Sequence, residues 1–140
     1  MHYNDLNTNP EFGHLLKGLE PIASAQADIE IERGAPEDYI AFLTEVGCGS
    51  LGDGDFHLFG GLVPAEEIYG AVTEDARRIS LFGSDAMGNG VGFLMPEGSV
   101  FDLDHESLEM SLVAPSFGDY IRILISEIAT YPHNILIGGQ

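Results

Sequence analysis

The densest group of side chains that could do chemistry lies at residues 102–106, where Asp102, Asp104, His105 and Glu106 stand close together. Carboxylate oxygens and an imidazole could hold a divalent metal, and a carboxylate–histidine pair could transfer a proton. No second ligand motif, such as His-x-x-x-His or an EF-hand loop, occurs in the sequence. Because these residues straddle a predicted strand end, solvation, turn capping or contact with a protein partner is favoured over metal binding or catalysis.

Two other features resemble reactive or binding motifs. The run Gly88–Gly92 could suggest a phosphate loop, but it lacks the Lys and Ser/Thr of a P-loop and joins two predicted strands. We interpret it as a hairpin turn. Cys48 follows a predicted helix end, where the helix dipole does not favour a thiolate, so we interpret it as structural. We therefore predict a protein that is not an enzyme, with no catalytic residue, cofactor or metal.

The charge balance is strongly acidic, with 23 Asp and Glu against 5 Lys and Arg and a formal net charge of -18. Such a field repels phosphate backbones, which excludes direct nucleic-acid binding, and it attracts basic proteins. The alternative is that the acidity only confers solubility. If the protein binds a basic partner, the candidate contacts are the acids on loops and strand ends: Asp53, Asp55, Asp85, Asp102, Asp104 and Glu106.

Length and composition indicate one globular domain over residues 1–140, since 140 residues with 44% hydrophobic content can bury a core. No apolar run approaches the roughly 20 residues that span a bilayer, and no signal-peptide pattern is visible. The single cysteine excludes an internal disulfide. We expect a soluble, cytoplasmic protein that does not enter the membrane; its oligomeric state stays open.

Residues 79–107 predict an antiparallel meander at the centre of a sheet. An Asn-Gly pair within residues 87–90 and a Pro-Glu-Gly-Ser run at residues 96–99 are turn signals. They separate three apolar segments: Ile79–Phe82, Val91–Met95 and Val100–Leu103. In the last segment Phe101 and Leu103 alternate with acids, so one face is apolar and the other acidic.

Four helices are predicted from start signals, namely a capping Asn or Ser, Pro in or next to the first turn, and acids. They begin near Asn9 (running to Leu19), Pro36 (burying Tyr39, Phe42, Leu43 and Val46), Pro64 (burying Ile68 and Val72) and Ser116 (burying Phe117, Ile121, Leu124, Ile125 and Ile128). Residues 22–34 are ambiguous: Ile29 and Ile31 alternate with Glu, which suggests a short strand or an extended linker, with a frayed helix as the alternative.

Two further segments complete the prediction. Phe56–Phe59 reads as a strand that Gly60-Gly61 breaks, and Ile135–Ile137 could form a terminal strand or lie loose. Helices precede a strand and helix, then a run of strands and a closing helix. This order predicts an α+β fold with a single, mostly antiparallel sheet of about five to six strands and helices packed against it.

Several motifs resemble those of the SUKH superfamily, the fungal cell-wall synthesis regulators and their bacterial relatives. They are Pro-Glu-Asp-Tyr-Ile-Ala-Phe-Leu at 36–43 with Gly-Cys-Gly at 47–49, the strand and helix of 56–72, the Gly-rich hairpin of 82–93, Val-Phe-Asp-Leu-Asp-His-Glu at 100–106 and Pro-Ser-Phe-Gly-Asp-Tyr-Ile at 115–121. The resemblance covers residues 34–131. Ala35 departs from the larger apolar residue that commonly precedes the Pro, and residues 1–33 match poorly, as an N-terminal extension or helix.

The resemblance implies a SUKH-like fold and a non-enzymatic protein. Bacterial members are mostly immunity proteins, or antitoxins, that neutralise polymorphic toxins by direct binding, and many of these toxins are basic nucleases or nucleic-acid deaminases. The acidic balance fits that role, because carboxylates can imitate phosphate in a toxin's cleft. The alternative is a regulatory or scaffolding interaction domain without a toxin partner.

Overall fold

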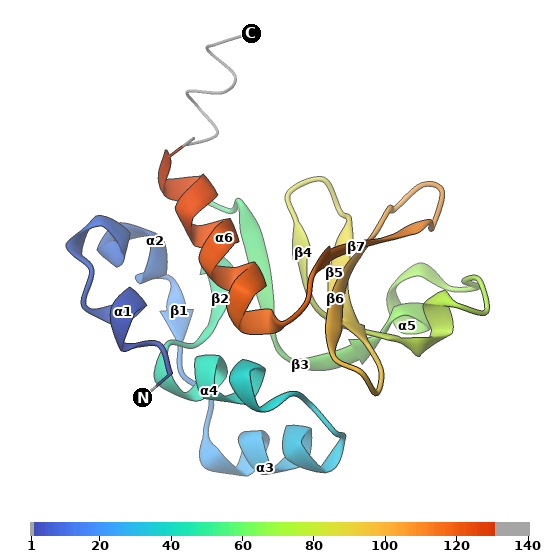
Figure 1. Ribbon diagram of the computed structural model, residues 1–140, viewed down its shortest axis with the longest axis horizontal. Coiled ribbons are helices and arrows are strands. Elements are labelled where there is room, and N and C mark those ends of the chain that lie inside the picture. Colours follow the sequence, from blue (N-terminus) through green and yellow to red (C-terminus); the bar gives the residue numbers. More distant parts are fainter. Residues whose placement is uncertain (1, 131–140) are drawn as a thin grey trace, which may run out of the picture.

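A computed structural model, which describes residues 2–130, has one antiparallel sheet with helices on both faces (Figure 1). Within the described residues the sheet has seven strands, and their order in space is their order in the chain. The strands are β1 (Leu19–Glu20), β2 (Cys48–Leu51), β3 (Phe56–Pro64), β4 (Ile79–Asp85), β5 (Gly90–Leu94), β6 (Ser99–Leu103) and β7 (Met110–Ala114). The α+β prediction is confirmed, and the strand number is slightly above the predicted five to six.

The helical segments lie before, between and after the strands. They are α1 (Asn4–Asn7), η1 (Pro10–Phe12), α2 (Gly13–Leu16), α3 (Ser24–Glu32), α4 (Glu37–Glu45), α5 (Ala65–Tyr69), η2 (Ala76–Arg78) and α6 (Phe117–Thr130). Among the described residues, no helix has the length and apolar character needed to cross a membrane. The predicted tail segment, Ile135–Ile137, lies outside the described residues.

The predicted meander is confirmed as β4, β5 and β6, which are consecutive antiparallel neighbours. Strand β7, which pairs with β6 at the edge of the sheet, was not predicted. Its sequence, Met-Ser-Leu-Val-Ala, does not keep the alternation of apolar and polar residues by which a half-buried strand is recognised, and its three central residues are all exposed. The strands β1 and β2 were missed as well, because Leu19 was assigned to a helix and residues 47–55 to a helix end and a turn.

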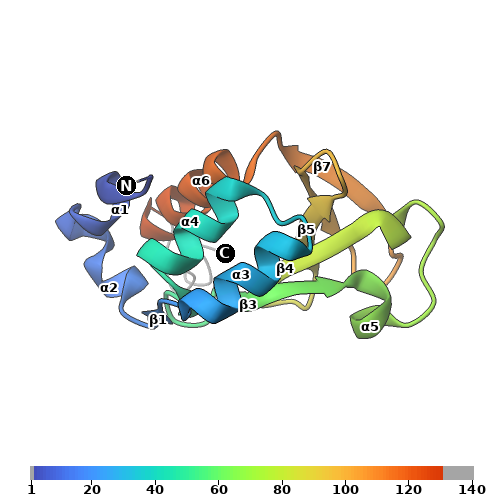
Figure 2. The ribbon, with the colours of Figure 1, turned by 90° about the horizontal axis from the view of Figure 1, so that it is seen from below.

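One face of the sheet is covered by α4 and α6, which lie side by side in Figure 2. Aromatic rings form the centre of this core. The ring centroid of Phe82 lies 4.9 Å from that of Phe93 and 5.0 Å from that of Phe117, and the centroids of Tyr39 and Phe117 are 5.2 Å apart. Asp38 of α4 accepts a 2.9 Å hydrogen bond from the Gly118 N–H, which ties the start of α6 to α4. The predicted helices at Pro36 and Ser116 are therefore confirmed.

The other face carries a smaller core beneath α5. Ile79, Leu81 and Leu103 are fully buried there, with Phe101 packed beside them. The predicted apolar face of β6 is thus confirmed. Val72 packs against this core as expected, but the prediction for Ile68 was wrong, because 44% of its surface is exposed and α5 ends one residue later.

The N-terminal helix prediction was only partly right. Asn9 accepts the Glu11 N–H as expected of a cap, but the helical segment ends at Leu16, and Leu19 pairs with Gly49 in β1. Tyr3 is buried in the main core, where its ring lies 5.1 Å from that of Phe42. The poorly matched N-terminal residues therefore contribute to the main core.

Residues 24–32 form helix α3, so the strand or linker interpretation was wrong and the helical alternative is correct. No strand of the described sheet pairs with this segment, and the helical period turns Ala27 and Glu30 inward while Ile29 and Ile31 are exposed. The alternation that suggested a strand consists of two exposed isoleucines.

The expected break at Gly60-Gly61 was also wrong, because β3 continues through it with a shift of register against β4. The shift leaves the Leu62 N–H to the buried carboxylate of Glu30, which accepts it at 2.8 Å. A Cβ at Gly61 would lie 2.6 Å from that carboxylate, so any larger residue would require Glu30 to move. The glycine pair admits α3 to the sheet and does not end the strand.

Candidate protein-binding site: the acidic end of the sheet

The six acids that the sequence singles out all lie at one end of the sheet. In an antiparallel meander successive turns alternate between the two ends, so the turns after β2, β4 and β6 share an end (Figure 1). We call this the acidic end and define it as residues 52–55, 85–89 and 102–109. It holds Asp53 and Asp55 in the first turn, Asp85 in the second, and Asp102, Asp104 and Glu106 at the third.

Asp85 organises the β4–β5 hairpin. Its carboxylate accepts the N–H groups of Met87 at 2.9 Å and Asn89 at 3.0 Å, and also the Asn89 side-chain amide at 3.1 Å. The carbonyl oxygen of the Asn89 side chain in turn accepts the His105 N–H at 3.0 Å and lies 2.7 Å from His105 Nδ1. The hairpin and the β6–β7 turn are thus joined by a hydrogen-bonded chain through Asn89.

Asp104 organises the β6–β7 turn in the same way. Its Oδ2 accepts the Ser107 N–H at 2.8 Å, the Ser107 hydroxyl at 2.9 Å and the Glu106 N–H at 3.2 Å. These hydrogen bonds hold the pKa of Asp104 below its ordinary value. Turn capping, one of the roles considered for residues 102–106, is therefore the role of Asp104.

Asp102 has the opposite electrostatic setting. Partial burial raises the pKa of its carboxyl, and the nearby charges of Asp85 and Asp104 raise it further. It borders a polar hollow of about 300 Å³, whose lining is Asn89, Asp102, Asp104, Ser107, Glu109 and Ser111. Glu109 was not among the predicted site residues, because it precedes a strand that was not predicted.

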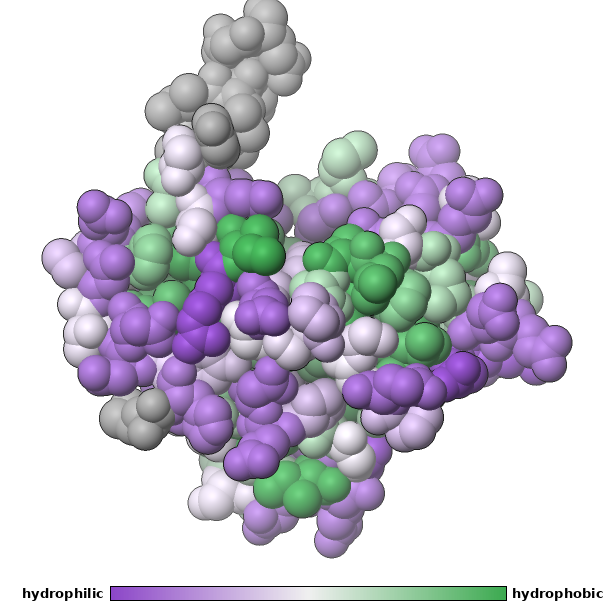
Figure 3. All heavy atoms as spheres, viewed as in Figure 1, coloured by the Kyte–Doolittle hydropathy of each residue, from purple (hydrophilic) through white to green (hydrophobic). Residues whose placement is uncertain are grey.

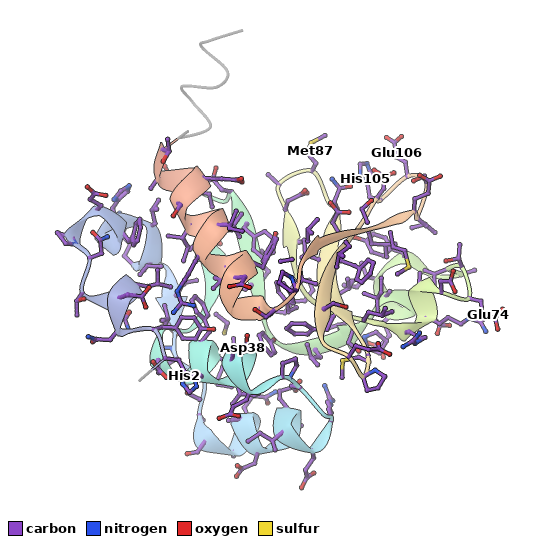
Figure 4. All side chains as sticks on the ribbon, viewed as in Figure 1. His2, Asp38, Glu74, Met87, His105 and Glu106 are labelled. Carbon is purple, nitrogen blue, oxygen red and sulfur yellow. The ribbon has the colours of Figure 1, made fainter. Side chains whose placement is uncertain are left out.

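The remaining acids differ in how far they are exposed. Asp55 accepts the Asp53 N–H at 3.2 Å, so this pair shapes the β2–β3 turn, while Asp53 itself is exposed. Figure 4 shows His105 and Glu106 at the outer tip of the β6–β7 turn, on the same side of the molecule as Met87. The Glu106 side chain is 82% exposed and lies 3.5 Å from His105 Nε2.

The chemistry available here is the presentation of negative charge. Within residues 2–130, no three His, Cys, Asp or Glu side chains are arranged to hold a metal ion. Cys48 lies in β2, and partial burial raises the pKa of its thiol, which makes it a weak nucleophile. The carboxylates that are least occupied by turn contacts, on Asp53, Glu106 and Glu109, are exposed and suited to meet a cationic surface.

No protein-family model matches the chain, and no curated protein is found to be similar to it. The SUKH resemblance therefore depends on the motifs themselves. In the structure these motifs fall on α4, on the strand and helix β3–α5, on the β4–β5 hairpin, on β6 and on the start of α6. They form the central sheet, the two helices over its aromatic core and the short helix on the other face.

Proposed function

We propose that the protein is a SUKH-like immunity protein, a non-enzymatic binder that neutralises a basic toxin domain of nuclease or deaminase type. The observation that carries the proposal is the convergence of all six predicted acids on one end of the sheet. Those turns contain no Lys or Arg in their sequence, so the charge at this end is not neutralised from within them.

Carboxylates gathered on one surface can act at two stages of association. At a distance they attract a basic partner and raise its association rate by a factor of about 10 or more at low salt. In contact they can pair with the Lys and Arg side chains that a nuclease uses to hold phosphate. Occupying that cleft would block the toxin without any catalytic step.

The first experiment is a pull-down with the purified protein from a lysate of its source, at low and at high salt, with mass spectrometry of the bound proteins. We expect one basic nuclease-like or deaminase-like partner that is retained at low salt and weakened at high salt, since screening removes the long-range attraction. A set of unrelated proteins, or none, would favour the regulatory or scaffolding alternative.

A matched pair of variants makes the test specific to the acidic end. Glu106→Lys with Glu109→Lys reverses two exposed charges there, and Glu32→Lys with Glu74→Lys makes the same change in total charge on α3 and on the loop after α5. We expect the first variant to lower the partner's association rate about tenfold at low salt and the second to lower it much less. Equal effects would show that total charge, and not this surface, governs association.

A further inference from the structure

The two edges of the sheet are closed to different degrees. At one edge β1 has only two residues, and its Leu19 is buried in the main core. At the other edge β7 has five residues, of which Ser111, Leu112 and Val113 are exposed in succession, and Leu112 is 64% exposed. Exposure on both faces of a strand means that β7 extends beyond the helices that cover the rest of the sheet. Within residues 2–130 no strand lies outside β7, and an uncovered edge of this kind is a template for pairing with another chain.

The register shows which backbone groups of β7 face outward. The Asp104 N–H donates to the Glu109 carbonyl, so that pair is hydrogen-bonded, and in an antiparallel ladder such pairs alternate. The next hydrogen-bonded pair is therefore Asp102 with Ser111, in the register that joins β6 to β7. The N–H and C=O groups of Met110 and Leu112 then point away from β6, toward the open edge. They are free of the β6 ladder and could bond one further strand.

The side chains of β7 give the two faces of this edge different chemistry. Leu112 pairs with Phe101, and Met110 with Leu103, so the face beneath α5 is apolar. Ser111 pairs with Asp102 on the other face and borders the hollow together with Glu109. In Figure 3 an apolar patch lies over β7, with hydrophilic residues beyond it toward the upper edge.

We propose that an extended segment of the basic partner adds to the sheet as a strand beside β7. Its backbone bonds Met110 and Leu112, and its side chains alternate between basic and apolar residues. The residue opposite Ser111 points to the face of Asp102, where Lys or Arg would enter the carboxylate-lined hollow. Its neighbours point to the opposite face, where apolar side chains would cover Leu112 and Phe101. This inference rests on the proposed function and assigns its docking edge.

Charge selects this occupant over a second copy of the chain. A second β7 would offer Met, Ser, Leu, Val and Ala, none of which is basic, and so nothing to place in the hollow. It would also bring another net charge of -18 against the same acidic end. An alternating basic and apolar strand satisfies the open backbone, the apolar face and the carboxylates together.

The test uses a short, end-blocked peptide in which Lys alternates with Val, added at low salt to isotope-labelled protein and followed by NMR. We expect the amides of Met110 and Leu112 to shift and their hydrogen exchange to slow, with weaker effects elsewhere. The same peptide with Glu in place of Lys tests the charge, and one with N-methylated backbone amides tests the ladder. We expect neither control to protect the two amides.

Two protein variants separate strand addition from simple charge attraction. Leu112→Pro removes an outward N–H without breaking the β6 ladder, a position where edge strands tolerate proline, and Leu112→Ala is its control. We expect Leu112→Pro to lower the affinity for the Lys-Val peptide about fivefold more than Leu112→Ala does. Glu109→Gln leaves the backbone intact and should lower the affinity for the peptide about two- to fivefold and reduce the salt dependence of binding. Circular dichroism and thermal unfolding confirm that each variant is folded.

Several outcomes would overturn the inference. Failure of millimolar peptide to protect the two amides, equal binding of the N-methylated peptide, or self-association of the free protein with protected β7 amides would each exclude a partner strand at this edge. The proposed function fails separately. If Leu112→Pro captured a basic partner as well as the parent protein does, the immunity role would stand but β7 would not be its docking edge. If the peptide bound β7 but no basic partner were captured, β7 would accept a strand but the immunity role would fail.

Discussion

The two ends of the sheet both carry many carboxylates but hold them differently. At the end opposite the acidic end, Arg33 pairs with Glu30 at 3.2 Å and Arg78 with Glu97 at 2.6 Å. At the acidic end, Asp85 and Asp104 are held by backbone N–H groups, the side-chain amide of Asn89 and the hydroxyl of Ser107. We call the end that holds the pairs Arg33–Glu30 and Arg78–Glu97 the arginine-paired end.

The difference concerns what remains after the carboxylates are satisfied. An arginine cancels the charge of the acid it bonds, whereas an amide or hydroxyl satisfies the oxygen and leaves the charge in place. The acidic end is therefore rigid and still negative, which suits a surface that must keep its shape while it attracts a cation. The predictions below test this contrast, beginning with the largest expected effect.

Glu30→Ala should destabilise the fold most, by about 3 kcal/mol in the free energy of unfolding. The substitution leaves the buried Leu62 N–H without an acceptor, removes the partner of Arg33 and empties the space beside Gly61. Chemical denaturation measures the loss. Glu32→Ala, on the exposed side of the same helix, is the control and should change stability by less than about 0.5 kcal/mol. Similar losses in both would show that Glu30 is not the joint between α3 and β3.

Asp85→Ala should cost about 1–2 kcal/mol, because it removes the acceptor of two backbone N–H groups and of the Asn89 side chain. Asp85→Asn keeps one acceptor oxygen and should recover part of the loss. Hydrogen exchange at Met87 and Asn89 reports the local effect. A full recovery of stability by Asn would show that hydrogen bonding, not charge, is what the hairpin needs from this residue.

Glu30 and Asp85 also differ in whether their roles could be predicted from the sequence. The hairpin of Asp85 was predictable because its turn signal, Asn-Gly between apolar segments, is local in the chain. The role of Glu30 was not, since its acceptor bond to Leu62 spans 32 positions and depends on a register shift in β3. Nothing local distinguishes Glu30 from the exposed Glu32.

The acidic end itself was predicted only as a set of residues. Their convergence requires β3, β4, β5 and β6 to be consecutive antiparallel neighbours, and the prediction did not place β3 beside β4. Glu109 and the open edge were missed together with β7, because Met110–Ala114 does not keep a regular alternation and has no turn signal of its own. The split of roles between Asp104 and Asp102 depends on three-dimensional contacts that the sequence does not show.

Glu97→Gln at the arginine-paired end should have a smaller effect, a loss of about 0.5 kcal/mol at low salt. Arg78 and Glu97 are both about half exposed, so solvent screens their attraction. Thermal unfolding at low and high salt measures it, and the difference between variant and parent should shrink as salt rises. A loss that is independent of salt would mean that packing of the two side chains, and not their charges, stabilises this turn.

Asp102→Asn should have the smallest effect and the opposite sign at neutral pH, a gain of less than about 1 kcal/mol. Burial and the charges of Asp85 and Asp104 raise the pKa of Asp102 above its ordinary 3.8, so folding makes the charged form of this carboxyl less favourable than it is in the unfolded chain. Its contribution to stability is therefore fully present below the unfolded pKa and is lost as the pH rises through the folded pKa, which is why removing the charge helps near neutral pH and not near pH 3.

Asp104→Asn is the matched control. Hydrogen bonds lower the pKa of Asp104, so its contribution is present above its unfolded pKa and is lost as the pH falls through the folded pKa, and neutralising it should reduce stability near neutral pH. Thermal unfolding of both variants across this range checks the signs. If both substitutions shifted stability in the same direction at neutral pH, the two acids would share one role, and the contrast between a carboxylate that shapes the turn and one whose charge lowers stability would be wrong.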